Sequence, residues 1–117
     1  MKAFTDIEQS KKLAEILPLE SADMWFHPYP NDEDWYDIPN IGNADLKFNQ
    51  LPCWSLAALL SLIKDKCGYF ELVYLKQTSD SKANPLENVY RLSTDVYDVY
   101  DKEAIDACYK MILKLHE

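Results

Sequence analysis

Glycine is almost absent from this sequence, since Gly42 and Gly68 are the only two in 117 residues. A dinucleotide-binding fingerprint needs three closely spaced glycines, and a P-loop needs two of them ahead of a lysine. Neither motif can be written with these two positions. The sequence therefore excludes the nucleotide-binding enzymes that depend on glycine-rich loops, and we expect the protein to use no cofactor.

Histidine and cysteine are also scarce, with two histidines and three cysteines. No Cys-x-x-Cys or His-x3-His spacing occurs, so no zinc site is predicted. The acidic run at residues 31–37 lacks the EF-hand spacing, which favours a solvated loop over a calcium site. The odd number of cysteines (Cys53, Cys67 and Cys108) argues against a disulfide framework and predicts reduced thiols in a cytoplasmic protein.

Basic residues are outnumbered, with 12 against 20 acidic residues and a net charge of −8. Because contacts to phosphates and anionic lipids need lysine and arginine, we expect no direct binding to nucleic acid or to a membrane. The most apolar run, residues 51–63, is too short to cross a bilayer, and the first residues carry no secretory signal core. The charge permits a basic protein partner, or simply favours solubility.

The composition is nevertheless that of a folded protein, with 48% apolar and 13% aromatic residues. A chain of this length buries roughly two thirds of the surface that its unfolded form exposes. It therefore needs neither disulfides nor a metal to hold a core. We expect one domain spanning residues 1–117.

The apolar run at residues 51–63 is the centre of the predicted fold. Within it, one helical face is marked by the i, i+3, i+4, i+7 spacing of Leu56, Leu59, Leu60 and Ile63. Only two serines interrupt the remaining surface, so the helix needs cover on several sides. We predict a buried central helix over residues 54–66, ended by Gly68 in the left-handed conformation.

In the N-terminal half, the sequence predicts one helix, one strand and a long irregular segment. Thr5 and Glu8 have capping-box spacing, which predicts a helix over residues 6–16. Residues 21–27 alternate as a strand. One face of this strand holds Ala22, Met24 and Phe26. The irregular segment covers residues 31–50, and four side chains are expected to pin parts of it back onto the body: Trp35, Tyr36, Ile38 and Ile41.

The next part of the chain predicts strands. Residues 69–76 are rich in branched and aromatic side chains and apolar on both faces, which is typical of a strand inside a sheet. A polar loop at residues 78–87 separates it from an antiparallel partner at residues 88–93. Residues 95–100 fit either a third strand or the entry to a helix.

The C-terminal segment predicts an amphipathic helix over residues 102–116, with Asp101 as its N-cap. Its apolar stripe holds Ala104, Ile105, Cys108, Met111, Ile112 and Leu115. Together these elements predict an α+β domain, in which a small, mostly antiparallel sheet of three to four strands packs with about three helices.

Acidic and aromatic side chains gather in one part of the sequence, and we expect them to form a binding surface. Residues 20–47 hold seven acidic residues and one basic residue, Lys47. Exposed aromatic rings among carboxylates are suited to anchor a basic protein. The candidate partner-binding residues are Trp25, Asp32, Glu33, Asp34, Trp35, Tyr36 and Asp37. The competing interpretation is that Trp25, Trp35 and Tyr36 cover the core.

Two alternatives to this interaction protein remain open at the level of sequence. One is a small enzyme or ligand-binding protein with a site between the central helix and residues 22–50, where Cys53 at a helix entry is the nucleophile and His27 its base. The other is a homodimer formed through the strand at 69–75 or through the last helix.

Three segments also carry a resemblance: residues 4–24, Pro-Cys-Trp-Ser-Leu-Ala-Ala-Leu-Leu at 52–60, and residues 104–117. They resemble a group of short uncharacterised proteins of Bacteroides-type gut bacteria that is associated with phage and other mobile elements. The resemblance implies a cytoplasmic bacterial or phage accessory protein, and it assigns no catalytic residue. The expected role is a non-enzymatic one in protein–protein interaction, as an acidic inhibitor, an immunity-type protein or a mimic of nucleic acid.

Overall fold

The computed structural model describes residues 2–30, 34–76 and 88–117. In chain order the elements are α1 (Ile7–Ala14), the 3-10 turn η1 (Leu19–Ser21), β1 (Met24–Phe26), β2 (Asn40–Ile41), the 3-10 turn η2 (Leu46–Phe48), β3 (Leu51–Cys53), α2 (Leu56–Cys67), β4 (Glu71–Leu75), β5 (Val89–Ser93), β6 (Asp98–Asp101) and α3 (Ala104–Leu115). Within the described residues these are three α-helices and six antiparallel strands, which confirms the predicted α+β class.

The strands form two separate three-stranded sheets, with the orders β2-β1-β3 and β4-β5-β6, where we expected one sheet. The first sheet arises because two segments pair with β1: β2, which lies in the segment predicted to be irregular, and β3, which begins the apolar run before the central helix. Trp25 is paired with Asn40 on one side and with Pro52 on the other. β2 and β3 have two and three residues. Runs this short show no alternation of polar and apolar residues, so the sequence pattern did not reveal them.

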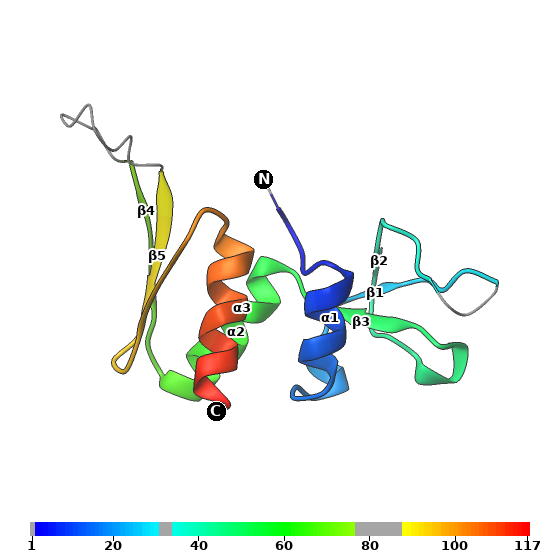
Figure 1. Cartoon of the computed structure of the whole chain (residues 1–117). Coiled ribbons are helices and arrows are strands. Elements are labelled where there is room, and N and C mark those ends of the chain that lie inside the picture. The colour runs from blue at the N-terminus through cyan, green and yellow to red at the C-terminus, as the bar shows by residue number, and fades with distance from the viewer. Residues whose placement is uncertain (1, 31–33, 77–87) are drawn as a thin grey trace.

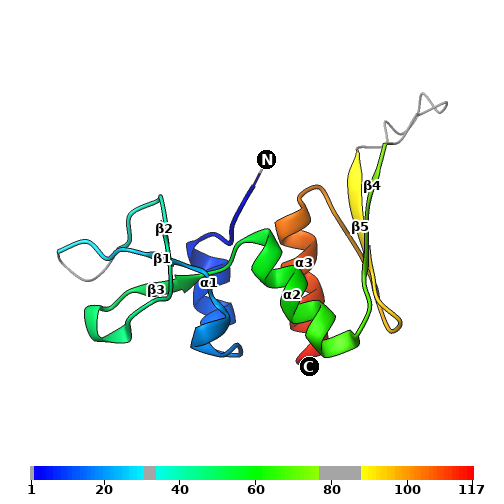
Figure 2. The same ribbon diagram turned by 180° about the vertical axis from the view of Figure 1, so that it is seen from behind.

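Figures 1 and 2 show two lobes along one axis of the molecule. We call α1 and β1–β3 the N-terminal lobe, and α2, α3 and β4–β6 the C-terminal lobe. In both views α2 and α3 lie side by side between α1 and the second sheet. The radius of gyration is 16.0 Å, against about 13 Å for a compact chain of this length. The molecule is therefore elongated.

A continuous core joins the lobes despite this shape. Leu13 of α1 and Leu17, three residues beyond the end of α1, belong to the same buried cluster as Leu59 of α2 and Ile105 of α3. Trp54, which is fully buried between the lobes, donates its indole N–H to Ser21 Oγ at 3.0 Å. A second, smaller cluster lies inside the N-terminal lobe and consists of Phe26, Leu51 and Cys53 with four half-buried neighbours. The buried face of β1 was thus predicted correctly at Phe26.

The first helix is capped one residue later than predicted. Asp6 Oδ1 accepts the backbone N–H of Gln9 at 2.8 Å, and Gln9 Oε1 accepts that of Asp6 at 3.1 Å, so the capping box is Asp6–Gln9. The expected cap, Thr5, is fully buried and its hydroxyl accepts the backbone N–H of Trp54 at 3.1 Å. Its hydroxyl is used to join distant segments of the chain, which a local motif cannot anticipate.

The central helix is confirmed and begins at Leu56. Ser55 is its N-cap, because Ser55 Oγ accepts the backbone N–H of Ala58 at 3.2 Å. Gly68 ends the helix with φ +76°, as predicted, and its N–H binds the carbonyl of Lys64.

Two expectations for the C-terminal lobe need correction, and one alternative that the sequence left open is decided. β4 lies at the edge of its sheet, where we expected an interior strand, and none of the described helices covers its second face, which carries Glu71, Val73 and Leu75. The ambiguous segment at 95–100 contributes β6, which begins at Asp98. The N-cap residue of α3 is Glu103, while the Asp101 carboxylate accepts from the Glu103 N–H and pairs with the Lys110 ammonium. The apolar stripe of α3 is buried as predicted, with Leu115 half-buried. The predicted loop at 78–87 lies outside the described residues.

Candidate functional site

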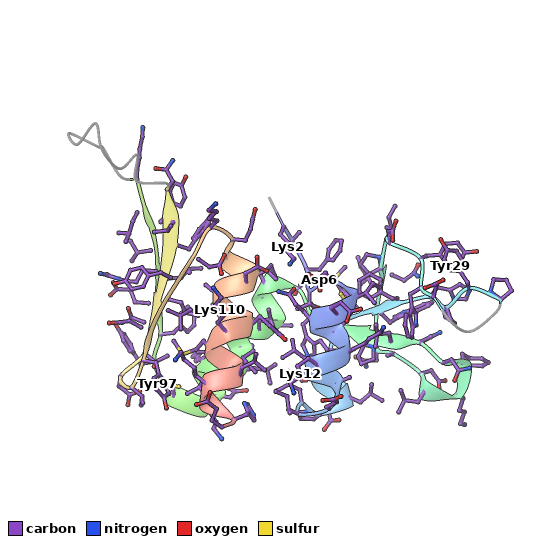
Figure 3. The ribbon with its side chains drawn as sticks, viewed as in Figure 1. Lys2, Asp6, Lys12, Tyr29, Tyr97 and Lys110 are labelled. Carbon is purple, nitrogen blue, oxygen red and sulfur yellow. The ribbon has the colours of Figure 1, made fainter. Side chains whose placement is uncertain are left out.

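A row of four aromatic rings lies on the outer surface of the N-terminal lobe. Because side chains alternate along a strand, buried Phe26 places its neighbours Trp25 and His27 on the opposite face of β1. His27 lies 5.8 Å from Trp25 and 5.7 Å from Tyr36, measured between ring centroids, and Tyr36 lies 4.3 Å from Tyr29. We call Trp25, His27, Tyr36 and Tyr29 the aromatic row; Figure 3 shows Tyr29 on the part of the N-terminal lobe that lies away from α2 and α3.

The row is held by a backbone ladder that extends β1 beyond its last residue. The N–H of Tyr36 donates to the carbonyl of His27 at 2.9 Å, and the N–H of Tyr29 donates to the carbonyl of Asp34 at 2.8 Å. A β-bridge joins Pro28 and Trp35 between these two bonds. The ladder holds residues 34–36 along residues 27–29, so the Tyr36 ring contacts the rings of His27 and Tyr29 and is fixed relative to the sheet.

The three predicted aromatic anchors have different environments. Tyr36 is 44% exposed, and Trp25 is half-buried on the outer face. Trp35 is half-buried against the Phe26 cluster, and the Lys11 ammonium lies 4.8 Å from its ring centroid. A cation of the chain itself therefore already occupies one face of Trp35. Tyr36 and Trp25 belong to the surface, and Trp35 supports it from beneath.

The predicted carboxylates also separate into groups. Asp34 and Asp37 are exposed beside the aromatic row, while Asp32 and Glu33 lie outside the described residues. Two further acidic side chains of residues 20–47 form hydrogen bonds within the protein. Asp23 accepts the backbone N–H and the hydroxyl of Ser55, and Asp45 accepts the backbone N–H of Lys47 at 2.9 Å.

This lobe carries a second group of exposed residues that the sequence pattern did not predict. Ile38 and Ile41, which we expected to pin the segment back onto the body, are 80% and 89% exposed. Leu46 and Phe48 on η2 are also exposed. The sequence does mark the ends of η2, because Asp45 caps its start and Asn49 ends it at φ +55°. Among the described residues, six of the ten exposed large hydrophobic side chains fall within residues 29–48.

The cysteine and histidine of the enzyme alternative are not brought together. Cys53 is fully buried, and its thiol donates to the carbonyl of Thr5 at 3.4 Å. Burial, with a smaller effect of the Asp23 carboxylate, raises the pKa of the Cys53 thiol to about 11, although the Thr5 hydroxyl opposes this. His27 is exposed on the other face of β1, against Tyr36. This arrangement holds neither a thiolate nor a base beside it.

The described part of the chain shows neither a metal-binding cluster nor a membrane-spanning helix. Within residues 2–30, 34–76 and 88–117, no group of three or more histidine, cysteine or acidic side chains is arranged to hold a metal ion. No helix in these ranges has the length and apolar character needed to span a membrane. No family model, curated protein sequence or solved structure matches this chain. Function must therefore be argued from the surface itself.

Proposed function

We propose that the chain is a non-enzymatic protein that binds a basic protein partner through the aromatic row and the carboxylates beside it. The observation that carries the proposal is the concentration of exposed apolar side chains in residues 29–48, within the more acidic half of the chain. Residues 1–55 hold ten acidic and four basic residues, whereas residues 56–117 hold ten and eight. The bacterial or phage context, the cytoplasmic location and the role as an inhibitor or immunity-type protein are parts of this proposal.

The two kinds of side chain have separate roles in such an interface. Aromatic rings bury a large area at low cost in side-chain entropy and supply most of the affinity at interface centres. Carboxylates such as Asp34 and Asp37 attract a basic partner and raise its association rate, with a strong dependence on ionic strength. Tyr and Trp faces also accept lysine or arginine side chains directly, as Trp35 accepts Lys11.

Mimicry of nucleic acid is the weaker version of this proposal. A mimic needs carboxylates that are rigid, regularly spaced and free to face the target in place of phosphates. Asp23 and Asp45 are instead bound to Ser55 and to the backbone of Lys47. We therefore favour recognition by aromatic anchors with acidic steering.

The test begins with affinity capture from a nuclease-treated bacterial lysate, followed by binding measurements on the purified captured protein. The informative variant is Asp34→Asn with Asp37→Asn. Its matched control is Asp95→Asn with Asp98→Asn, which changes the net charge equally at exposed positions of the other lobe. We expect only the first pair of substitutions to lower the association rate and flatten its dependence on salt.

A second pair of variants separates the aromatic contribution from charge. Tyr36→Ala is expected to weaken binding by about tenfold or more, as at interface anchors, while Tyr100→Ala, at a similarly exposed ring on β6, leaves it unchanged. Equal effects of the matched variants, or capture of no basic protein, would overturn the proposal.

A further inference from the structure

The two sheets have four outer edges, and three of them are protected against pairing with another strand. β2 has only two residues. β3 contains Pro52, is buried along its length and is followed by the bridge between Phe4 and Ser55. β6 carries Asp98, which is exposed, and leads directly into α3. Short length, proline, cover and charge are the usual devices that prevent edge pairing.

Among the residues that the structure describes, β4 has none of these protections. It has five residues without proline, and among the described strands it pairs only with β5. Its one carboxylate, Glu71, is held by the Arg91 guanidinium at 3.1 Å. Val73 and Leu75 are half-buried on the sheet face that α3 does not cover, and Tyr74 is 51% exposed. Figures 1 and 2 show the helices on one side of this sheet only.

We propose that two copies of the chain associate through β4, joining their sheets into one six-stranded antiparallel sheet. A two-fold axis perpendicular to the sheet pairs residues of the same face, so that Val73 lies opposite Val73 of the second copy. Leu72 then lies opposite Tyr74, and Glu71 lies opposite Leu75. This register uses all five residues of β4 and places no like charges opposite each other.

Charge distribution explains why the occupant is a second copy. The excess of acid lies in residues 1–55, and residues 56–117 are close to balance. Two copies that meet at β4 therefore approach through the half of the chain with the least mutual repulsion.

Sedimentation of the full chain from low micromolar to near-millimolar concentration tests the proposal. We expect the mass to rise from that of the 13.6 kDa monomer toward twice that value. Val73→Lys places two ammonium groups opposite each other and is expected to raise the dissociation constant by about tenfold or more. The matched control is Val96→Lys, which adds the same charge at a 63% exposed position between β5 and β6.

Hydrogen exchange on the unmodified protein provides a measurement that does not depend on the variant folding. Amides of β4 are expected to gain protection as the concentration rises, while those of β6 do not. A monomer at every concentration, or equal dimerisation by the two lysine variants, would overturn the proposal. A monomer would also leave the β4 edge available to a strand of another protein. Neither outcome bears on the aromatic row, which lies in the other lobe.

Discussion

Buried polar side chains show how single residues join the parts of this protein. Thr5 is fully buried, lies 2.8 Å from the Ser10 hydroxyl, and exchanges hydrogen bonds with the segment at 53–54 through both its backbone and its side chain. Cys53 completes the cluster through its thiol. Each of these groups has a partner, so burial does not leave an unsatisfied donor or acceptor at this junction.

Thiol labelling tests this arrangement. Burial raises the pKa of the Cys53 thiol to about 11 and that of the Cys108 thiol to about 12. Near pH 8 the reactive thiolate is therefore scarce in the folded state, since an exposed thiol has a pKa of about 8.5. Iodoacetamide is expected to label half-buried Cys67 first, and Cys53 and Cys108 only after unfolding in urea. Cys67→Ser is the control, and fast labelling of Cys53 in the folded protein would contradict the prediction.

At the scale of elements, the two glycines end or bend segments for which other residues are poorly suited. Gly68 ends α2 at φ +76°, near the left-handed region that an L-residue can reach at modest cost. Gly42 follows β2 at φ +128°, outside that region, and donates its N–H to the Asp23 carbonyl at 2.8 Å. Because their backbone angles differ, replacing each glycine with a residue that has a side chain should destabilise the fold to a different extent.

We expect Gly42→Ala to destabilise the fold more than Gly68→Ala. A methyl group at position 68 meets no atom within 4 Å, so the cost is the left-handed backbone alone, about 1 kcal/mol. At position 42 it meets the Trp25 indole nitrogen at 3.8 Å, an ordinary contact, so the cost comes from the strained backbone and reaches about 1–3 kcal/mol. Urea denaturation measures both, and a larger loss for Gly68→Ala would contradict this account.

At the scale of the whole molecule, an elongated shape is combined with a core that crosses both lobes. The extents are 53 × 32 × 23 Å. Leu13 and Trp54 pack in one cluster with residues of α2 and α3, and the Lys2 ammonium bridges Asp6 and Asp106 at 2.9 and 2.7 Å. Because these contacts cross the boundary between lobes, we predict that the chain unfolds as one domain.

Two spectroscopic probes weight the two lobes differently. All three tryptophans (Trp25, Trp35 and Trp54) belong to residues 25–54, whereas α2 and α3 dominate the helical circular dichroism. We expect both signals to change at the same urea concentration. Leu13→Ala should lower both urea midpoints together, because it reduces the free energy of unfolding by about 2–5 kcal/mol. Leu46→Ala, at an exposed position, should change the free energy of unfolding by less than about 0.5 kcal/mol. Separate transitions would show two independently folding lobes.

Sequence reasoning succeeded where the determinant was local. The i, i+3, i+4 pattern located α2 and α3 to within two residues at each end, and Gly68 marked the end of α2. It failed for β2 and β3 because their pairing partners, not their own residues, make them strands. It also misjudged Ile38 and Ile41, since an apolar side chain in an irregular segment carries no indication of which surface it meets.

The candidate site was predicted as a stretch of sequence and not as a surface. Acidic and aromatic residues near position 35 were evident in the chain, but the order Trp25, His27, Tyr36, Tyr29 depends on the ladder that folds residues 34–36 back along residues 27–29. The sequence left open whether Trp35 is an exposed anchor or a cover for the core, and its packing against the Phe26 cluster decides for the second.

The sequence by itself determined the α+β class, the two long apolar helices and the acidic character of the N-terminal half. Side-chain periodicity and charge are properties of neighbouring residues, so they can be read along the chain. Only the tertiary structure decided that the strands form two sheets, that β4 lies at the edge of its sheet and that the aromatic row faces outward. These features depend on contacts between residues far apart in sequence, where several arrangements satisfy the same local pattern.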